Sequence, residues 1–333
     1  MKDRRRDPLV ALMADAAYRR IESRLGALAA DIEVILMRED HQLEHAGSGR
    51  SVTLAQAQPI VAWAGSETFI DGRFAALIDA ALNSPAMAWF QSGAAGTDNP
   101  LFSLLMSKGI RLTACDAPAE AVADYVLAGV LDHYQCGGER RKAQRQQEWM
   151  PLPFTEIGDL RWLILGFGSI GQCVARRAAA FGANITAVMR RTQSAPFAQR
   201  VVPPSALGSL LPVSDVLVLA LPLTADTQGL VGTDFLARLK PGSLLVNVSR
   251  GRIVNESALL AGLARNQPGH AILDVCAVEP LPVGNPLWHN PRVTLTAHLA
   301  GMGSGLMARS DALFLNNLQR YCAGSALLHE VGV

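Results

Sequence analysis

The sequence predicts an α/β protein with a doubly wound parallel sheet and a second, smaller α/β domain. Short runs of almost continuously apolar residues recur along the chain, and most intervals between them are long enough for a helix. Strands that are covered by helices on both faces are apolar along their whole length, so such runs are typical of parallel sheets. The length of 333 residues also favours two domains over one.

The first hundred or so residues predict the smaller domain. Leu9–Met13 and Ile32–Met37 are apolar β-type runs, and Ala14–Ala30 between them has apolar residues at helical spacing. A strand, a helix and a strand in this order form a βαβ unit, which implies parallel strands. The alternation continues with expected strands at Ile60–Trp63, Met87–Phe90 and Ile110–Thr113, and with an expected helix at Arg73–Leu82.

From Leu160 the alternation becomes more regular and predicts the larger sheet. A sheet of six such strands fits a dinucleotide-binding domain. The clearest helix follows the first strand, because Ile170, Val174 and Ala178 fall on one face. A last helix is expected at Leu306–Cys322. The six runs are Trp162–Leu165, Ile185–Met189, Val216–Leu221, Leu244–Val248, Ala271–Val275 and Val293–Thr296.

A glycine-rich turn joins the first of these strands to its helix. Residues 166–171 read Gly-Phe-Gly-Ser-Ile-Gly, a G-x-G-x-x-G pattern. Gly166 permits a tight turn, Gly168 lets the backbone approach a pyrophosphate, and Gly171 lets the helix pack on the sheet. The helix start, with Ser169 and Ile170, supplies amide donors to phosphates. Ordinary turn glycines are the simpler alternative, but the strand–turn–helix context favours dinucleotide binding.

The end of the second strand indicates which dinucleotide is bound. An NAD site places Asp or Glu here to hold the ribose hydroxyls. This chain has Met189-Arg190-Arg191-Thr192 instead, and no acidic residue lies between Ala183 and Ser214. Two guanidinium groups suit a 2′-phosphate, so NADP(H) is the expected cofactor, with NAD(H) possible. A solvated Arg-Arg turn is the alternative.

Three polar residues follow expected strands in the second half: Arg250, Glu279 and His298. Ligands of open α/β sheets bind at the carboxyl ends of the strands. Reduction of a 2-keto acid needs a cation for the carboxylate and keto oxygen, a proton donor, and a carboxylate that favours the charged form of that donor. These three residues meet those needs. Taken singly, each also has a structural reading: a loop cation, a solvated acid, or a buried histidine.

The segments that carry these residues resemble the D-isomer-specific 2-hydroxyacid dehydrogenase family. The matching motifs are Asn247-Val248-Ser249-Arg250-Gly251, then Asp274-Val275 with Glu279-Pro280-Leu281, and His298 followed by Ala300-Gly301. The resemblance covers about residues 86–301 well, and the first 85 only by pattern. It implies that Arg250 binds the substrate carboxylate and keto oxygen, and that His298 is the acid/base with Glu279 as its partner. Asp274 is then expected to face the nicotinamide amide.

The resemblance also implies the domain plan. A Rossmann-type dinucleotide domain, residues 114–300, is inserted into a flavodoxin-like substrate domain made of residues 1–113 and 301–333. The family's substrate loop is similar to residues 93–98, where the amides of Ala95 and Gly96, next to Ala94, are expected to hold the carboxylate. The family further implies a homodimer. Leu221, Pro222, Val248 and Ser249, at strand ends, are expected to complete the cofactor site.

Three segments together resemble the NADPH-dependent glyoxylate/hydroxypyruvate reductase branch of the family. They are Arg190-Arg191, residues 149–153 and Val61-Ala62-Trp63. In that branch a tryptophan like Trp63 lines the substrate pocket; a core aromatic is the equal alternative.

Two residues depart from the pattern of the family. Ala297 replaces the proline that usually precedes the family's histidine, which bears on the positioning of His298. Asn255 replaces a usual acid at a helix start, where Asn caps as well as Asp.

Composition excludes several other classes. The 30 Lys and Arg against 29 Asp and Glu leave a net charge of +1, without the basic excess that nucleic acid or an anionic membrane needs. No apolar run is long enough to span a bilayer. Acidic residues interrupt a signal-peptide reading of the start, Met1–Arg6. Five scattered cysteines without a Cys-x-x-Cys pair indicate reduced thiols and no metal site, so a soluble cytoplasmic protein is expected.

The expected function is hydride transfer from NADPH to a small 2-keto acid, giving the 2-hydroxy acid. Two alternatives remain. A dinucleotide-sensing, corepressor-like member of the same family would keep the three residues but turn over little substrate. A Rossmann methyltransferase would explain the glycine turn, but it gives no joint role to Arg250, Glu279 and His298.

Overall fold

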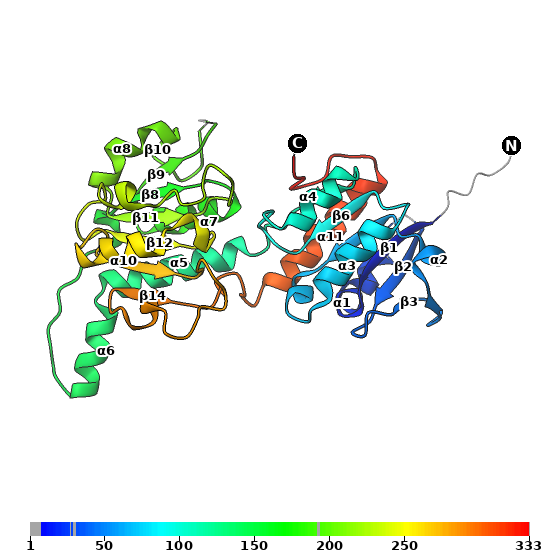
Figure 1. Ribbon diagram of the computed structural model, residues 1–333, viewed down its shortest axis with the longest axis horizontal. Coiled ribbons are helices and arrows are strands. Elements are labelled where there is room, and N and C mark those ends of the chain that lie inside the picture. Colours follow the sequence, from blue (N-terminus) through cyan, green and yellow to red (C-terminus); the bar gives the residue numbers. More distant parts are fainter. Residues whose placement is uncertain (1–7, 27, 29–30, 192–193, 333) are drawn as a thin grey trace. The chain divides into compact units, whose positions relative to one another are not determined.

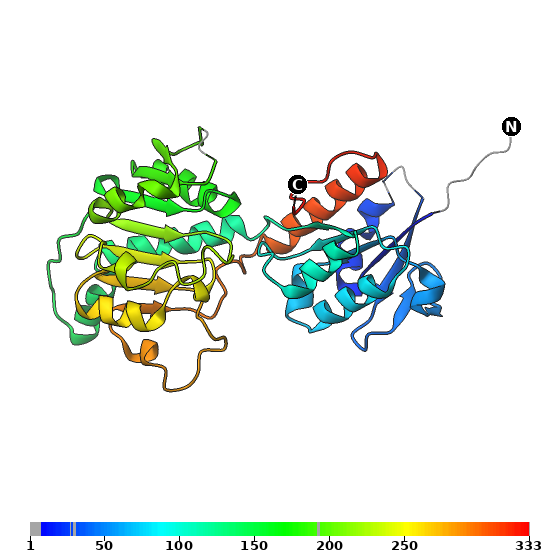
Figure 2. The same cartoon turned by 45° about the horizontal axis from the view of Figure 1, so that its top comes forward.

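The computed structural model describes residues 8–26, 28, 31–191 and 194–332. The chain divides into unit 1 (Met1–Pro118 and Ser304–Val333) and unit 2 (Ala119–Gly303). The predicted divisions, after residues 113 and 300, fall a few residues before these. Each unit holds a seven-stranded sheet flanked by helices (Figures 1 and 2). The signal-peptide question at Met1–Arg6, and Thr192 of the predicted cofactor segment, lie outside the described residues.

The sheet of unit 2 is parallel throughout, in the order β10-β9-β8-β11-β12-β13-β14. Chain order runs outward from β8 in both directions, which confirms the predicted doubly wound, Rossmann-type sheet. The sequence missed only β10, a strand of three residues with one buried side chain, Val202. The strands are β8 (Arg161–Leu165), β9 (Asn184–Val188), β10 (Arg200–Val202), β11 (Val216–Leu219), β12 (Leu244–Asn247), β13 (His270–Leu273) and β14 (Val293–Leu295).

Successive side chains of these strands enter two separate cores. Trp162 and Ile164 of β8 join the core under α5 and α7, whereas Leu163 and Leu165 join the core under α8 to α10. A strand buried on both faces has no polar position to spare, which explains the continuous apolar runs of the sequence. The helices of unit 2 are α5 (Ala119–Tyr134), α6 (Gly137–Gln146), α7 (Ser169–Ala180), α8 (Leu207–Leu210), α9 (Thr233–Leu236) and α10 (Glu256–Ala264).

The sheet of unit 1 has the order β4-β3-β2-β1-β5-β6-β7. The five strands β2, β1, β5, β6 and β7 are parallel and follow a flavodoxin-like order, as predicted. The antiparallel strands β3 and β4 were not predicted, because they carry no fully buried side chain. The strands are β1 (Leu9–Ala14), β2 (Ile32–Met37), β3 (Leu43–His45), β4 (Ser51–Val52), β5 (Val61–Ala64), β6 (Trp89–Ser92) and β7 (Arg111–Thr113).

Helices cover the sheet of unit 1 on both faces. They are α1 (Asp15–Leu25), α2 (Leu54–Ala57), α3 (Arg73–Asn83), α4 (Pro100–Ser107) and α11 (Leu306–Cys322). α1 is shorter than the predicted Ala14–Ala30, and residues 27, 29 and 30 of that prediction lie outside the described residues. α11 returns from the end of the chain to pack beside α1, and its Phe314 and Leu318 are fully buried.

Trp63 belongs to this core, which corrects the expectation that it lines a substrate pocket. Its side chain is 0% exposed. The indole stacks on Phe314 of α11 at a centroid distance of 4.3 Å and an interplanar angle of 9°. Odd-numbered residues of β5 face α1 and α11, so the pleat of the strand turns this tryptophan into the interior.

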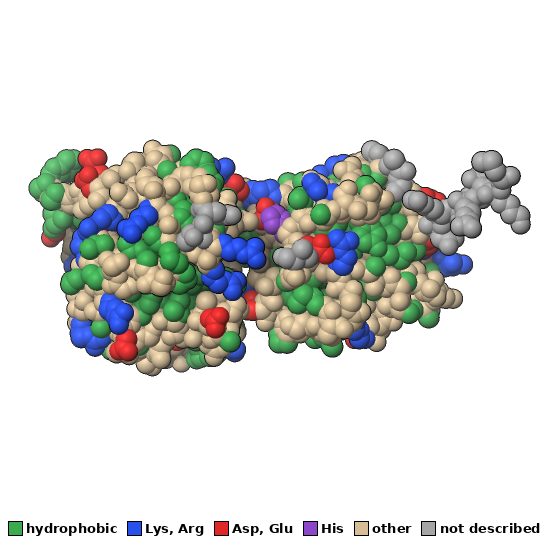
Figure 3. All heavy atoms as spheres, turned by 90° about the horizontal axis from the view of Figure 1, so that it is seen from above, with side chains coloured by type: hydrophobic (Ala, Val, Ile, Leu, Met, Phe, Trp, Pro, Cys, Tyr) green, Lys and Arg blue, Asp and Glu red, His purple; other side chains and the backbone are tan. Residues whose placement is uncertain are grey.

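One face of the molecule can be compared with the balance of charge in the composition. On the face in Figure 3, Lys and Arg side chains are dispersed among acidic and apolar ones. Among the described helices, none combines the length and the apolar character that crossing a membrane would need. All five cysteines are free thiols.

Candidate active site

The glycine turn between β8 and α7 leaves room for a phosphate. Gly166 has φ +90°, and a Cβ there would lie 2.3 Å from the Ala220 carbonyl oxygen. A Cβ on Gly171 would lie 2.2 Å from the Gly166 carbonyl oxygen, so both positions require glycine. At Gly168, by contrast, a Cβ meets nothing within 4 Å, and no side chain caps α7. The open space before the uncapped amides of this helix fits a pyrophosphate.

Arg190 and Arg191 follow β9 at the same edge of the sheet. The Met189 amide donates to the Val202 carbonyl at 3.1 Å, which keeps the chain beside β10 until the two arginines begin. Both arginines are exposed. Neither guanidinium has a hydrogen bond or ion pair with another described residue, so both charges are available to a ligand phosphate.

The other predicted cofactor residues end the neighbouring strands. Leu221 is half-buried and Pro222 exposed after β11, while Val248 and Ser249 are buried after β12. The amide and hydroxyl of Ser249 donate to Asn247 Oδ1 at 3.1 and 2.7 Å. Because all strands of this sheet are parallel, these residues share the edge that carries the glycine turn.

His298 and Glu279 form a hydrogen-bonded pair at this edge. Nδ1 of His298 lies 2.8 Å from Glu279 Oε2, and Oε1 of the same carboxylate accepts from the Cys276 amide at 2.9 Å. The side chains are 48% and 38% exposed, so both are accessible to a ligand. A carboxylate at Nδ1 favours a proton on that nitrogen, which leaves Nε2 to exchange a proton with substrate.

Arg250 is held beside this pair by a buried asparagine and a close backbone contact. Asn247, 0% exposed, donates from Nδ2 to the Arg250 carbonyl at 3.2 Å. The Arg250 Nη1 donates to the Ser249 carbonyl at 2.8 Å. A Cβ on Gly251 would lie 1.9 Å from the Cys276 carbonyl carbon. Only glycine lets the turn of Arg250 lie directly against the loop of Glu279.

Asp274 is hydrogen-bonded to the turn that carries His298. This side chain is 3% exposed, and its carboxylate accepts hydrogen bonds from the Thr296 hydroxyl and from the amides of Leu299 and Ala300. The sequence did not predict this role. The expected contact of Asp274 with a nicotinamide amide remains a prediction.

The remaining chemistry of this edge is limited. Burial raises the pKa of the Cys276 thiol to about 11, and Glu256, Glu279 and Asp274 add to the effect. The thiol is therefore protonated at neutral pH and is a poor nucleophile. In the described ranges, His, Cys, Asp and Glu side chains nowhere form a group of three placed to hold a metal ion.

In unit 1, the predicted substrate loop follows β6. A Cβ on Gly93 would lie 2.5 Å from the Ser66 amide nitrogen, so the loop begins tightly packed. The Ala94 amide donates to the Ser92 hydroxyl at 3.0 Å, and the Ala94 carbonyl accepts from the Cys115 amide at 2.9 Å. The next two amides, of Ala95 and Gly96, donate to no described residue. An anchored loop with two available amides suits a carboxylate.

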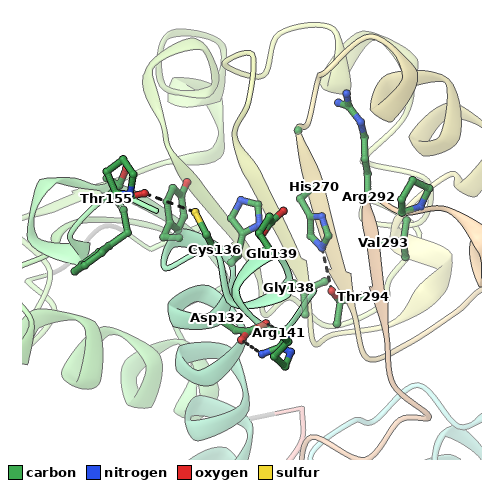
Figure 4. Close-up of a pocket in the computed structure, with 18 residues that line it drawn as sticks. Asp132, Cys136, Gly138, Glu139, Arg141, Thr155, His270, Arg292, Val293 and Thr294 are labelled. Atoms are coloured by element: carbon green, nitrogen blue, oxygen red, sulfur yellow. Dashed lines mark hydrogen bonds and ion pairs between the residues drawn. The ribbon is translucent and has the colours of Figure 1, made fainter. Parts of the chain in front are cut away.

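A separate cavity of about 840 Å³ opens at the opposite edge of the unit 2 sheet (Figure 4). His270, at the amino end of β13, is hydrogen-bonded through Nε2 to the Thr294 hydroxyl at 2.9 Å. The His133 ring lies 4.9 Å from the His270 ring, and an ion pair joins Asp132 to Arg141 of α6. None of the predicted site residues lines this cavity.

The fold and the glycine turn thus define a two-unit α/β protein with a dinucleotide-binding sheet. The model of the D-isomer specific 2-hydroxyacid dehydrogenase NAD binding domain matches residues 127–300, more than half of the chain. The chain belongs to the D-isomer specific 2-hydroxyacid dehydrogenase family, as the motifs around Arg250, Glu279 and His298 predicted.

Individual relatives agree with this assignment. Glyoxylate/hydroxypyruvate reductase A of Serratia proteamaculans (strain 568) is 34% identical over 184 residues, which span 55% of this chain and 59% of the relative. A D-isomer specific 2-hydroxyacid dehydrogenase from Xanthobacter autotrophicus Py2, solved with NADPH and MES, is 25% identical with a TM-score of 0.75 over 97% of this chain and 98% of its own. A family member from Aeromonas salmonicida subsp. salmonicida A449 is 26% identical, with a TM-score of 0.77 and the same coverage.

Proposed function

We propose that this protein reduces small 2-keto acids, such as glyoxylate or hydroxypyruvate, with a preference for NADPH. The observation that carries the proposal is the 2.8 Å contact between His298 Nδ1 and Glu279 Oε2, at the sheet edge that bears Arg250 and the glycine turn. Family membership and the similarity to a glyoxylate/hydroxypyruvate reductase support it. The matched part of the chain spans 59% of that relative, so the substrate class rests mainly on the site.

The residues divide the reaction between them. When bound, reduced nicotinamide supplies the hydride that adds to the keto carbon. Arg250 binds the substrate carboxylate and the keto oxygen, where negative charge develops. His298 donates the proton from Nε2 to that oxygen, so the products are the 2-hydroxy acid and the neutral imidazole. Glu279 stabilises the imidazolium before transfer and holds the ring in place.

The cofactor preference is assigned to Arg190 and Arg191. Both are exposed at the end of β9, where an NAD site would carry an acid. A double substitution, Arg190→Gln with Arg191→Gln, is expected to raise the KM for NADPH by at least about tenfold, because each charged contact contributes about 1.5–3 kcal/mol. The KM for NADH should change little. An equal loss for both cofactors would place the 2′-phosphate elsewhere.

We also assign substrate-carboxylate binding to the amides of Ala95 and Gly96, with Ala94 anchoring the loop. The support is the tight packing of Gly93 and the two amides that donate to no described residue. Ala95→Pro removes one amide donor without adding charge. We expect it to raise the KM for the keto acid and to leave the dissociation constant of NADPH unchanged.

We further propose that the protein is a homodimer that uses the segment after α6. In Figure 1, α6 projects from the body of unit 2, and the segment that follows α6 in the chain, with residues 149–154, runs back along the outside of the unit. α6 buries only Ala143, and the segment exposes Trp149 (101%), Met150 (50%) and Phe154 (51%). Clustered exposed apolar side chains mark interaction surfaces.

Sedimentation velocity of the wild type and of Trp149→Ser with Phe154→Ser tests the dimer. A dimer that dissociates in the double variant supports the assignment. Val283→Ser is the matched control, since Val283 is equally exposed (102%) but lies outside this segment. A wild type that sediments as a monomer at micromolar concentration would refute the dimer.

The first test of the function itself is oxidation of NADPH and NADH, side by side, with glyoxylate, hydroxypyruvate and pyruvate. Turnover with NADPH preferred supports both the catalytic residues and the arginine pair. Turnover with NADH preferred keeps the chemistry and rejects the phosphate site. Cofactor binding without turnover on any keto acid would favour the dinucleotide-sensing alternative.

A further inference from the structure

The turn that carries His298 is held in an unfavourable backbone conformation. His298 has φ +55°, in the left-handed region. For a residue other than glycine this region costs about 1–2 kcal/mol. The preceding residue is Ala297, which does not restrain the backbone covalently as a proline would. The surrounding structure must therefore hold the turn.

Hydrogen bonds to Leu273 and Asp274 supply most of that restraint. The Thr296 amide donates to the Leu273 carbonyl at 3.0 Å, and the His298 amide donates to the Asp274 carbonyl at 2.7 Å. The Leu299 and Ala300 amides donate to the two oxygens of the Asp274 carboxylate at 2.9 and 3.0 Å. The orientation of this one carboxylate thus determines the path of the backbone directly after His298, at Leu299 and Ala300.

Two hydroxyl groups in series fix that carboxylate. The Thr296 hydroxyl donates to Asp274 Oδ1 at 2.7 Å, and the Tyr125 hydroxyl lies 2.8 Å from Thr296 Oγ1. A hydroxyl has a single hydrogen, and that of Thr296 is used on the carboxylate, so Tyr125 must be the donor to Thr296. Burial raises the pKa of Tyr125, and the nearby Asp274 adds to this against the effect of Thr296. Tyr125 therefore keeps its proton at neutral pH.

We propose that Tyr125 and Thr296 are positioning residues for His298. Tyr125 lies on α5, and its side chain packs against the apolar core of unit 2. It therefore links the turn to that core. Neither hydroxyl is hydrogen-bonded to the imidazole; they act by orienting Asp274, which holds the turn that keeps Nδ1 on Glu279. This inference rests on the proposed role of His298 as the proton donor.

The kinetic test compares Thr296→Val, which exchanges the hydroxyl for a methyl group, with Thr296→Ser, which keeps the hydroxyl. We expect Thr296→Val to lower kcat about tenfold while the KM for the keto acid changes less than about threefold, because misplacement of a reacting group acts mainly on the transition state. Thr296→Ser should restore most of kcat. Tyr125→Phe, one bond further away, should lower kcat about threefold.

Thr294→Val is the matched control, since its hydroxyl bonds His270 at the other edge of the sheet. It should leave kcat unchanged. Equal losses in Thr296→Val and Thr296→Ser, or in Thr294→Val, would show a general packing effect and overturn the proposal.

A second measurement does not need turnover. Long-range 1H–15N spectra of the protein without ligand report which ring nitrogen of His298 carries hydrogen, with His298→Asn used for the assignment. For the neutral ring, we expect the hydrogen on Nδ1 alone in the wild type and Thr296→Ser, and a mixture of tautomers in Thr296→Val. Identical spectra would overturn the proposal. A wild type without reductase activity would refute the proposed function, and these spectra would still decide the positioning role.

Discussion

The sheet of unit 2 is parallel, and that of unit 1 is parallel except for β3 and β4. In both sheets the strand order reverses near the middle, between β1 and β5 in unit 1 and between β8 and β11 in unit 2. Ligands of such sheets bind at the carboxyl ends of the strands flanking the reversal. In unit 2 this place is the open glycine turn. In unit 1 it is closed: Asp15 follows β1 and pairs with Arg73, whose side chain is 3% exposed.

The chemistry of the two edges differs accordingly. Arg73 donates to Asp15 Oδ1 at 2.6 Å, to the Met37 carbonyl at 2.9 Å and to Asp71 Oδ2 at 2.6 Å, so its donors face the protein itself. His298 and Glu279 of unit 2 are instead about half exposed, at 48% and 38%. The same position in a sheet can thus hold internal ion pairs that stabilise the fold, or accessible groups that are available to a ligand.

The largest effect on this contrast is expected from His298→Asn. Asparagine tolerates the left-handed backbone but cannot act as the proton donor. Turnover of the keto acid should fall about 10²–10⁴-fold, as is usual for loss of a general acid. Steady-state kinetics with NADPH measures this. His41→Asn in unit 1, also left-handed and exposed, is the control and should have full activity. Wild-type turnover in His298→Asn would remove this residue from the mechanism.

Arg73→Met should act on stability instead. It leaves Asp15 and Asp71 without their buried partner, and such a loss costs about 3–5 kcal/mol. Urea unfolding followed by tryptophan fluorescence measures it, since Trp63 and Trp89 are buried in unit 1 and report on it together with the tryptophans of unit 2. The matched control is Arg111→Met, whose ion pair with Glu330 is more exposed and should matter far less. If both variants unfold alike, the ion pairs at the unit 1 edge are not a main source of stability.

Two glycines of unit 2 separate packing from binding. Gly251→Ala places a Cβ 1.9 Å from the Cys276 carbonyl carbon, so the backbone must move, at a cost of about 1–3 kcal/mol. Gly168→Ala meets no atom within 4 Å and should leave the unfolding midpoint nearly unchanged. It should nevertheless weaken NADPH binding, measured by fluorescence titration, because the methyl group enters the phosphate space. Unchanged NADPH affinity in Gly168→Ala would argue against that space as the phosphate site.

The smallest expected effect is a pH dependence of opposite sign in the two units. Burial lowers the pKa of His270 to about 4 and also lowers that of His133. Unit 2 should therefore lose stability as the pH falls from about 6.5 toward 4, since the unfolded chain takes up these protons first. In unit 1, the Asp116 carboxylate raises the pKa of His329. The stability that protonated His329 contributes is therefore fully present below its pKa in the unfolded chain. It is lost as the pH rises through its pKa in the folded protein.

Unfolding midpoints between pH 8 and about 5.5, where carboxylates of ordinary pKa stay ionised, measure both effects. His270→Gln should reduce the loss of stability that occurs as the pH falls. His329→Gln should remove the stability that protonation of His329 contributes at low pH. Slopes that neither variant changes would show that other groups govern stability in this range.

Local sequence predicted most of the elements around the site. The apolar runs gave the positions of six of the seven strands of unit 2, and the glycine pattern identified the turn in which Gly166 does adopt φ +90°. The strand ends placed Glu279 and His298 at one edge of the sheet, the family resemblance implied that they pair, and their side chains lie 2.8 Å apart. Parallel strands make such predictions possible, because their carboxyl ends share one edge.

The role of Trp63 could not be read in this way. An apolar residue in a buried strand faces one side of the sheet or the other, and only the helix that covers that side decides what it contacts. Here α11, from the far end of the chain, places Phe314 on the indole. A pocket position and a core position look the same in sequence.

What the sequence determined by itself was therefore the set of elements, the glycine turn and the chemical types of residue at the strand ends. These depend on periodicity and on neighbours a few residues away. The tertiary structure decided that Trp63 is core, that Arg73 closes the edge of unit 1, and that Tyr125 supports Thr296 across 171 residues of chain. Such contacts join distant segments, and their energies depend on burial and direction, which arise only when the chain has folded.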